Sequence, residues 1–174
     1  DTISISGDQN NLNTIDGGLG DDYVYIGGID NSSNTVTTGS GYDTVAITGT
    51  NDDSNIIDTG TEADVVSITG SGSDNNEITT GNENDTLTLG GTNNDSNTAN
   101  MGDGNNSVSL SGTGADSNVI TAGTGNDALT IDGSSNGING GNTFNLGDGD
   151  NTATVTGDSN IDITLTSGAG SDTV

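Results

Sequence analysis

Apolar residues alternate with hydroxyl-bearing residues in short stretches that recur along the whole chain. Each stretch follows an Asp or Asn, here called the anchor. The residues two and four positions after it are apolar in every complete repeat. Alternation with a period of two predicts strands that turn one face to a core and the other to solvent. A second, shorter strand is predicted around an apolar residue fourteen positions after the anchor, such as Ile15, Val36 or Ile57.

The anchors recur every 21 residues, and this spacing changes only once, to 24. Glycines keep the same phase, six residues after and four residues before an anchor. Two strands and two turns per repeat predict an all-β fold, a parallel two-sided β-solenoid (β-roll or β-helix) of about eight coils. We expect one repeat array over residues 1–174, with an outward bulge where the insertion lies, at about 134–142. The anchors are Asp1, Asp22, Asp43, Asp64, Asp85, Asn106, Asp127, Asn151 and Asp172.

A second column of polar residues stands at one phase of the repeat, just before the shorter strand. It contains asparagine in seven successive repeats, and we call it the Asn13 column. Stacked amides hydrogen-bond along a column, so we expect a ladder that runs from coil to coil. Its members are Asn13, Asn34, Asn55, Asn76, Asn97, Asn118 and Asn142.

Composition alone would indicate disorder. Leu, Ile, Val and Phe make up about 19% of the 174 residues, and the formal net charge is −26. The repeat overturns that interpretation, because each coil of a solenoid buries its apolar residues against neighbouring coils. About three inward apolar residues per coil are then sufficient.

The charge excludes several classes of function. The chain has no Lys, Arg or His, so it cannot neutralise phosphates, and we expect neither nucleic-acid nor anionic-membrane binding. It also lacks Cys, which together with the missing Lys and His removes the usual bases, nucleophiles and transition-metal ligands. Every Asp belongs to a repeating column, so we expect no enzyme. The carboxylates and carbonyls that remain suit hard cations.

Stacked anchors create an electrostatic problem. Two carboxylates about 4.8 Å apart repel by about 3.5 kcal/mol at an effective dielectric constant of 20. Either a cation lies between them or the side chains splay into water. Calcium fits the first case because it accepts six to eight oxygen ligands in flexible geometry. In the alternative, these Asp and Asn residues make ordinary turns and cap the local backbone.

The stretch from Gly17 to Tyr25, GGLGDDYVY, matches the nonapeptide G-G-x-G-x-D-x-U-x at each specified position. The sequence therefore resembles the RTX (repeats-in-toxin) β-roll family in a degenerate form with a longer coil. The resemblance implies a secreted, extracellular protein that requires Ca²⁺ to fold. It also implies that motif Asp side chains and carbonyls of the glycine turns bind the ion. The corresponding residues are Asp22, Asp43, Asp64, Asp85, Asp127, Asp172, Gly18, Gly20, Gly39, Gly41, Gly123 and Gly125.

From these features we expect a calcium-stabilised structural segment of a filament, adhesin stalk, matrix fibre or surface layer. Both chain ends fall within a repeat, so we expect end-to-end self-association or contact with neighbouring repeats of a longer chain. The alternative function is a module that binds ice or glycan through the Thr- and Ser-rich outer face of the first strands. Such Thr ladders resemble those of ice-binding β-solenoids, although threonine is also simply a good strand former.

Overall fold

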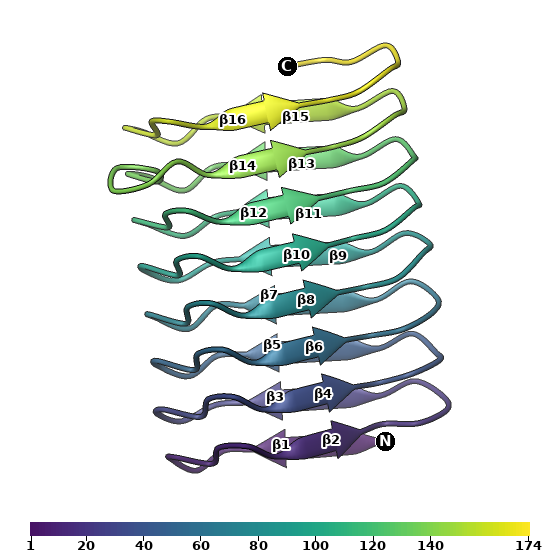
Figure 1. Cartoon of the computed structure of the whole chain (residues 1–174), viewed down its shortest axis with the longest axis vertical. Helices are drawn as coiled ribbons and strands as arrows, with labels where there is room; N and C mark the ends of the chain where they lie inside the picture. Colours follow the sequence, from purple (N-terminus) through teal and green to yellow (C-terminus); the bar gives the residue numbers. More distant parts are fainter.

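The computed structural model describes residues 1–174, which form strands and turns only (Figure 1). It contains no helix of the length and apolar character that crossing a membrane requires. One sheet consists of β1 (Thr2–Ile5), β3 (Tyr23–Ile26), β5 (Thr44–Ile47), β7 (Val65–Ile68), β9 (Thr86–Leu89), β11 (Ser107–Leu110), β13 (Ala128–Ile131) and β15 (Thr152–Val155). The facing sheet consists of β2 (Thr14–Asp16), β4 (Thr35–Thr37), β6 (Ile56–Asp58), β8 (Glu77–Thr79), β10 (Thr98–Asn100), β12 (Val119–Thr121), β14 (Thr143–Asn145) and β16 (Thr164–Thr166).

Neighbouring strands in both sheets are parallel and keep the register that the repeat predicts. Val24 pairs with Val45 in the first sheet, and Ile15 pairs with Val36 in the second, each 21 residues apart. The predicted all-β, parallel, two-sided solenoid of about eight coils is therefore confirmed.

The insertion leaves this register intact. Leu129 pairs with Ala153 across it, 24 residues apart, in phase with every other coil. The extra residues lengthen the turn between β13 and β14, which forms the wide loop in Figure 1.

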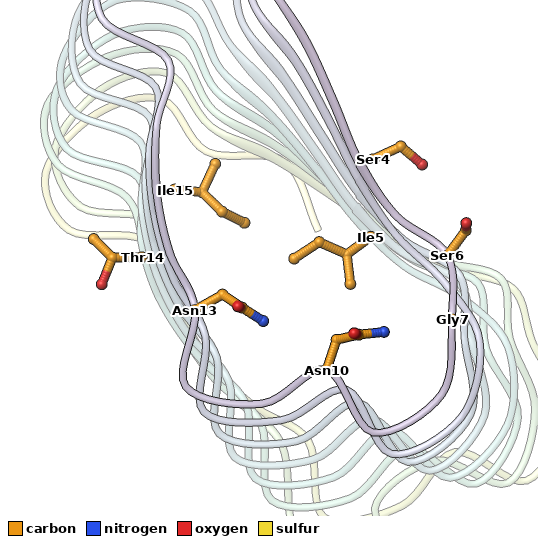
Figure 2. A pocket seen from close by; sticks show the side chains of 8 residues that line it. All are labelled: Ser4, Ile5, Ser6, Gly7, Asn10, Asn13, Thr14 and Ile15. Carbon is orange, nitrogen blue, oxygen red and sulfur yellow. The ribbon is translucent and has the colours of Figure 1, made fainter.

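The core is a thin column between the two sheets. Seen from the N-terminal end, Ile5 and Ile15 point into this space, whereas Ser4, Ser6 and Thr14 point away from it (Figure 2). The equivalent residues of the inner coils, such as Val24, Ile26 and Val36, are fully buried. Full burial of such a side chain contributes about 1.5–3 kcal/mol, so three per coil give a continuous apolar seam.

The coil reverses direction at two edges. The first edge holds the turns that carry the anchors, such as residues 17–22, and lies on the right in Figure 1. The second edge holds the turns from a longer to a shorter strand, such as residues 27–34, and lies on the left. Backbones approach closely at both edges: a Cβ on Gly60 or on Gly70 would collide with a carbonyl oxygen of the preceding coil.

The Asn13 column forms the amide ladder that the sequence predicts. Its members from Asn34 to Asn142 are buried. The side-chain amide of Asn34 donates to Oδ1 of Asn55 at 3.1 Å, and that of Asn76 donates to Oδ1 of Asn97 at 3.0 Å. Main-chain N–H groups donate to the same oxygens, as Asn34 does to Asn55 at 2.9 Å. The second edge is thus held by groups that supply both donors and acceptors.

Candidate functional site

The anchors form a column inside the first edge and do not extend into water. Asp22, Asp43, Asp64, Asp85 and Asp127 are at most 3% exposed. Of the two arrangements that repulsion allows, splaying into solvent is therefore wrong for these five. The repeat could not reveal this, because the strand alternation that predicts burial stops at the turn.

One oxygen of each anchor has a regular partner. From Asp43 to Asp172, Oδ1 accepts a hydrogen bond of 2.7–3.0 Å from the main-chain N–H of the anchor one coil earlier. This bond fixes the side chain in the same orientation in every coil. The other terminal atom, Oδ2 in aspartate or Nδ2 in asparagine, therefore occupies an equivalent position in every coil.

The second oxygen, Oδ2, has no hydrogen-bond partner in the five buried aspartates. A buried charged group without a partner carries a large desolvation penalty, so these five oxygens need an explanation. Asp172 differs, because it is only half-buried and its Oδ2 accepts a bond of 3.0 Å from the Ser167 hydroxyl.

The two asparagine anchors reveal what surrounds this second atom. In Asn151, Nδ2 donates to the carbonyls of Gly147, Gly149 and Ser167 at 3.1, 3.3 and 3.0 Å. In Asn106, Nδ2 donates to the carbonyls of Gly102 and Gly104 at 3.3 and 3.4 Å. The amide thus lies in a ring of carbonyl oxygens supplied by its own turn and the next coil.

In the aspartate coils an oxygen occupies the place of that amide. Asp22 illustrates this, because a Cβ on Gly17 would contact both its Oδ2 and the carbonyl oxygen of Thr38. In all five buried aspartates, Oδ2 has no hydrogen-bond partner. Such a group requires either a proton or a cation.

A neighbouring column follows this alternation of aspartate and asparagine in most coils. The residue five positions before the anchor is Thr38, Thr59 or Thr80 in three aspartate coils, whereas Met101 and Leu146 precede the two asparagines. The Thr59 hydroxyl donates to the carbonyl of Thr80 at 3.3 Å. In these five coils a hydroxyl accompanies each carboxylate and an apolar side chain accompanies each amide, whereas Asp22 has Gly17 and Asp127 has the buried Ala122 at this position.

Burial affects the charge of these carboxyls. It raises the pKa of Asp64 to about 6 from an ordinary value of 3.8. The nearby Thr59 hydroxyl and the Asp43 N–H oppose this rise. Burial likewise raises the pKa of Asp85 and Asp127. The apo site therefore resists ionisation, which an internal cation would reverse.

No three acidic side chains converge into a cluster that could hold a metal ion by themselves. Carbonyl oxygens of the turns must supply the other ligands. Of the six glycines that the RTX resemblance indicates, five have the positive φ that turns these peptides, and Gly123 is the exception. The carbonyls of Gly18 and Gly39 also accept main-chain bonds from the next coil, at 3.3 and 3.0 Å.

Two first-edge turns depart from the glycine pattern. Glu62 and Glu83 replace the second glycine of the turn, with φ of 76° and 89°. Together with Tyr42, Ala63 and Asn84 they line a surface hollow of about 340 Å³. Oε2 of Glu62 accepts the main-chain N–H of Gly41 at 3.0 Å. The turns of these two coils thus keep the conformation of the glycine turns, with backbone strain at Glu62 and Glu83 because their φ angles are positive.

The outer face of the first sheet carries the hydroxyl ladder described above. Thr86 and Thr88, Ser107 and Ser109, and Thr152 and Thr154 point outward from β9, β11 and β15, whereas β13, between β11 and β15, has Ala128 and Thr130 at these positions. Tyr25 interrupts the ladder, and its hydroxyl accepts a bond of 2.9 Å from Thr48. The hydroxyl ladder is therefore interrupted at Ala128 in the C-terminal half and by the tyrosines of β3.

No protein-family model matches the sequence, and the comparison with curated proteins gives no match. Among solved structures, the fold is similar to that of a hyperactive, Ca²⁺-dependent, β-helical antifreeze protein from an Antarctic bacterium. The TM-score is 0.54 and the sequence identity 24%, over 98% of this chain and 62% of that chain. The chain thus spans less than two thirds of its structural neighbour, and the likeness establishes the β-solenoid fold.

Proposed function

We propose that this chain is a calcium-stabilised structural β-solenoid of an extracellular filament, adhesin stalk, matrix fibre or surface layer. The observation that carries the proposal is the set of five buried carboxylate oxygens that have no hydrogen-bond partner. Calcium accepts carboxylate and carbonyl oxygens together, so it suits these surroundings. The Ca²⁺ dependence of the antifreeze protein with the same fold agrees with this choice.

The proposed ligands come from the aspartate anchors and their turns. Asp22, Asp43, Asp64, Asp85 and Asp127 would each supply Oδ2, with Asp172 as a weaker member of the column. Carbonyls four and two residues earlier would complete the shell, in the place where Gly147 and Gly149 receive the Asn151 amide. For the coils that fit the motif best, these carbonyls belong to Gly18 and Gly20, Gly39 and Gly41, and Gly123 and Gly125.

The structural role rests on the repetition of the fold. We assign no catalytic role, because the acids stand in columns of equivalent environment. At the N-terminal end a hollow of about 490 Å³ exposes Ile5, Ile15, Asn10 and Asn13, the inward residues of the first coil (Figure 2). A further coil would cover it by strand addition, either from adjoining repeats or from a second copy. Sedimentation at increasing concentration tests the second source, and Ile5→Asp should abolish any association.

Calorimetric titration with calcium, combined with circular dichroism, tests the metal. We expect several calcium ions to bind per chain and the β signal to collapse when a chelator removes them. Identical spectra with and without chelator, and no heat of binding, would show that protons neutralise the column and would overturn the proposal.

Ice binding is the second candidate, because the structural neighbour is an antifreeze protein and the outer face of β9, β11 and β15 carries a hydroxyl ladder. Thr88→Tyr and Thr154→Tyr would disrupt this face. Thr98→Tyr, on the outer face of the opposite sheet, is the matched control. Thermal hysteresis lost in the first two variants and kept in the third would favour ice binding. The absence of hysteresis in the native chain would favour the structural role.

A further inference from the structure

A second buried column runs inside the second edge, nine residues after each anchor. We call it the Asn10 column. Its side-chain oxygens repeat the ladder of the first edge: Oδ1 of Asn31 accepts the N–H of Asn10 at 2.7 Å, and Oδ1 of Asn94 accepts the N–H of Ser73 at 2.9 Å. Figure 2 shows the first member, Asn10, pointing into the interior of the coil. The members are Asn10, Asn31, Asp52, Ser73, Asn94, Ala115, Asn136 and Asn160.

Three amides of this column donate to glycine carbonyls. Nδ2 of Asn31 donates to Gly27 at 2.6 Å. Nδ2 of Asn94 donates to Gly70 at 3.0 Å, and Nδ2 of Asn160 donates to Gly133 at 2.9 Å. Gly70 and Gly133 each belong to the coil that precedes the donating asparagine. The place of the amide in this column is therefore bordered by carbonyl oxygens.

Asp52 puts a carboxylate oxygen in that place. It is fully buried, and its Oδ1 accepts the N–H of Asn31 at 2.8 Å, so the side chain keeps the orientation of the column. Its Oδ2 has no partner. A Cβ on Gly49 would contact both this oxygen and the carbonyl oxygen of Gly28, the equivalent of Gly70 for Asn94.

The next member of the column is unusual as well. Ser73 is fully buried, and its hydroxyl has no hydrogen-bond partner. The serine side chain has two heavy atoms fewer than the asparagine side chain found at most positions of the column. It therefore places a smaller side chain with an unpartnered hydroxyl at the position of the column that follows Asp52. Two adjacent buried groups without partners, one of them a carboxylate, occur together in these two coils.

Burial is the main cause that raises the pKa of Asp52 above its ordinary value of 3.8; nearby negative charge adds to the rise, and the N–H groups of Asn31 and Gly49 oppose it. The carboxylates of Asp53 and Asp30 lie close enough to repel that of Asp52. The chain has no Lys, Arg or His to compensate any of them. Neutralisation must come from outside the protein.

We propose that Asp52 and Ser73 form a single calcium site buried in the second edge, with the Gly28 carbonyl as a further ligand. The ligands are hard oxygens, one of them charged, which suits calcium. This site does not depend on the first-edge column, since it lies at the opposite edge and involves different turns. Asp52 also differs from Asn31, Asn94 and Asn160 of its own column, whose amides donate to glycine carbonyls.

Asp52→Asn tests the proposal, because it completes the amide column with the residue found at Asn31 and Asn94. The matched control is Asp53→Asn, which removes the same charge from the neighbouring, partly exposed position. We expect equilibrium dialysis with calcium to show one fewer bound ion per chain for Asp52→Asn and no change for Asp53→Asn. Ser73→Ala should weaken or abolish the same ion while keeping Asp52.

Equal calcium counts for Asp52→Asn and Asp53→Asn would overturn the proposal and indicate a protonated Asp52 that donates to a carbonyl. In chelator, we expect Asp52→Asn to melt at a higher temperature than the native chain, because the uncompensated carboxylate is gone. Asp52 and Asp53 both lie at the second edge, so the difference in bound calcium between their variants reports on that edge alone. It therefore stays informative even if the first-edge column binds no calcium.

Discussion

The two edges of the solenoid use the same ladder and differ in a single atom. In the anchor column and in the Asn13 column, Oδ1 accepts a main-chain N–H from the preceding coil, as in Asp43 to Asp64 at 2.8 Å and Asn34 to Asn55 at 2.9 Å. The other terminal atom is an oxygen at the first edge and an NH₂ group at the second. The amide provides its own donor, whereas the carboxylate needs an external cation or proton. The amide ladder of the second edge therefore supplies its own donors and acceptors, whereas the carboxylate column of the first edge depends on the cations and pH of the solution.

The exceptions within each edge sharpen this contrast. Asn106 and Asn151 bring the amide solution into the first edge, where they donate to turn carbonyls. Asp52 brings an unpartnered carboxylate into the second edge. Whether a position needs a cation or a proton thus depends on its own side chain and not on the edge where it lies. Exchanging Asp and Asn should therefore transfer the cation requirement from one edge to the other.

The largest effect should come from converting the first edge into an amide column. Replacing Asp22, Asp43, Asp64, Asp85 and Asp127 by Asn removes five buried carboxylates whose Oδ2 has no partner, only one of which, Asp22, is paired through its other oxygen with the N-terminal ammonium. In chelator this should stabilise the fold by on the order of 10 kcal/mol. Circular dichroism during thermal unfolding checks it. The control variant carries five exposed Asp→Asn changes of equal charge, at Asp16, Asp58, Asp132, Asp158 and Asp162. If both variants unfold alike in chelator, the burial of the anchors is not what makes the edge depend on cations.

The reverse change should create a cation requirement where none exists. Asn106→Asp replaces an amide that donates to Gly102 and Gly104 with a carboxylate, next to the apolar Met101. We expect a loss of about 4 kcal/mol in chelator, because a buried charge is left without a partner. One additional calcium ion per chain should bind and restore the loss. Asn105→Asp, at the exposed neighbouring position, should do neither.

A smaller effect should appear on changing pH in the calcium-free protein. The pKa of Asp64 is about 6 in the fold against 3.8 ordinarily, so the folded state binds more protons between these values. Stability should consequently fall by about 3 kcal/mol as pH rises from 4 to above 6. The upward shifts of Asp85 and Asp127 act in the same direction. Denaturant titrations at several pH values measure this slope, which Asp64→Asn should reduce. A slope of opposite sign would mean that these carboxylates have stabilising partners.

The smallest effect concerns the turns. Glu62 holds a φ of 76° at a position where Gly20 and Gly41 serve in other coils. Glu62→Gly should stabilise the fold by about 1 kcal/mol in denaturant titration, because glycine adopts this conformation without a steric penalty. Ser96→Gly, at a second-edge turn with a φ of 58°, should gain less, since a short polar side chain tolerates that region better. Destabilisation by Glu62→Gly would show that the bond from Gly41 to the Glu62 carboxylate outweighs the strain.

Strands, register and core could be predicted from the sequence because they depend on a period-two pattern that repeats in phase. Val24 and Ile26 were predicted to point inward on that basis, as was the amide ladder of Asn34 and Asn55. The orientation of the anchors could not be predicted, because a turn residue has no alternation to orient it and a charged side chain is ordinarily assumed to face water. The burial of the Asp52 carboxylate could not be predicted for the same reason. It stands in a column that becomes visible only when the second edge is seen to bury its polar side chains.

The insertion between β13 and β14 has a practical consequence. Three extra residues enter one turn, yet Leu129 still pairs with Ala153 and Ile120 with Phe144. The scaffold therefore tolerates foreign sequence at this loop without mechanical disturbance of the coils above and below. An epitope or enzyme-recognition peptide inserted beside the exposed Ile138 would keep the buried Asn136 and be displayed on a rigid rod at a defined height.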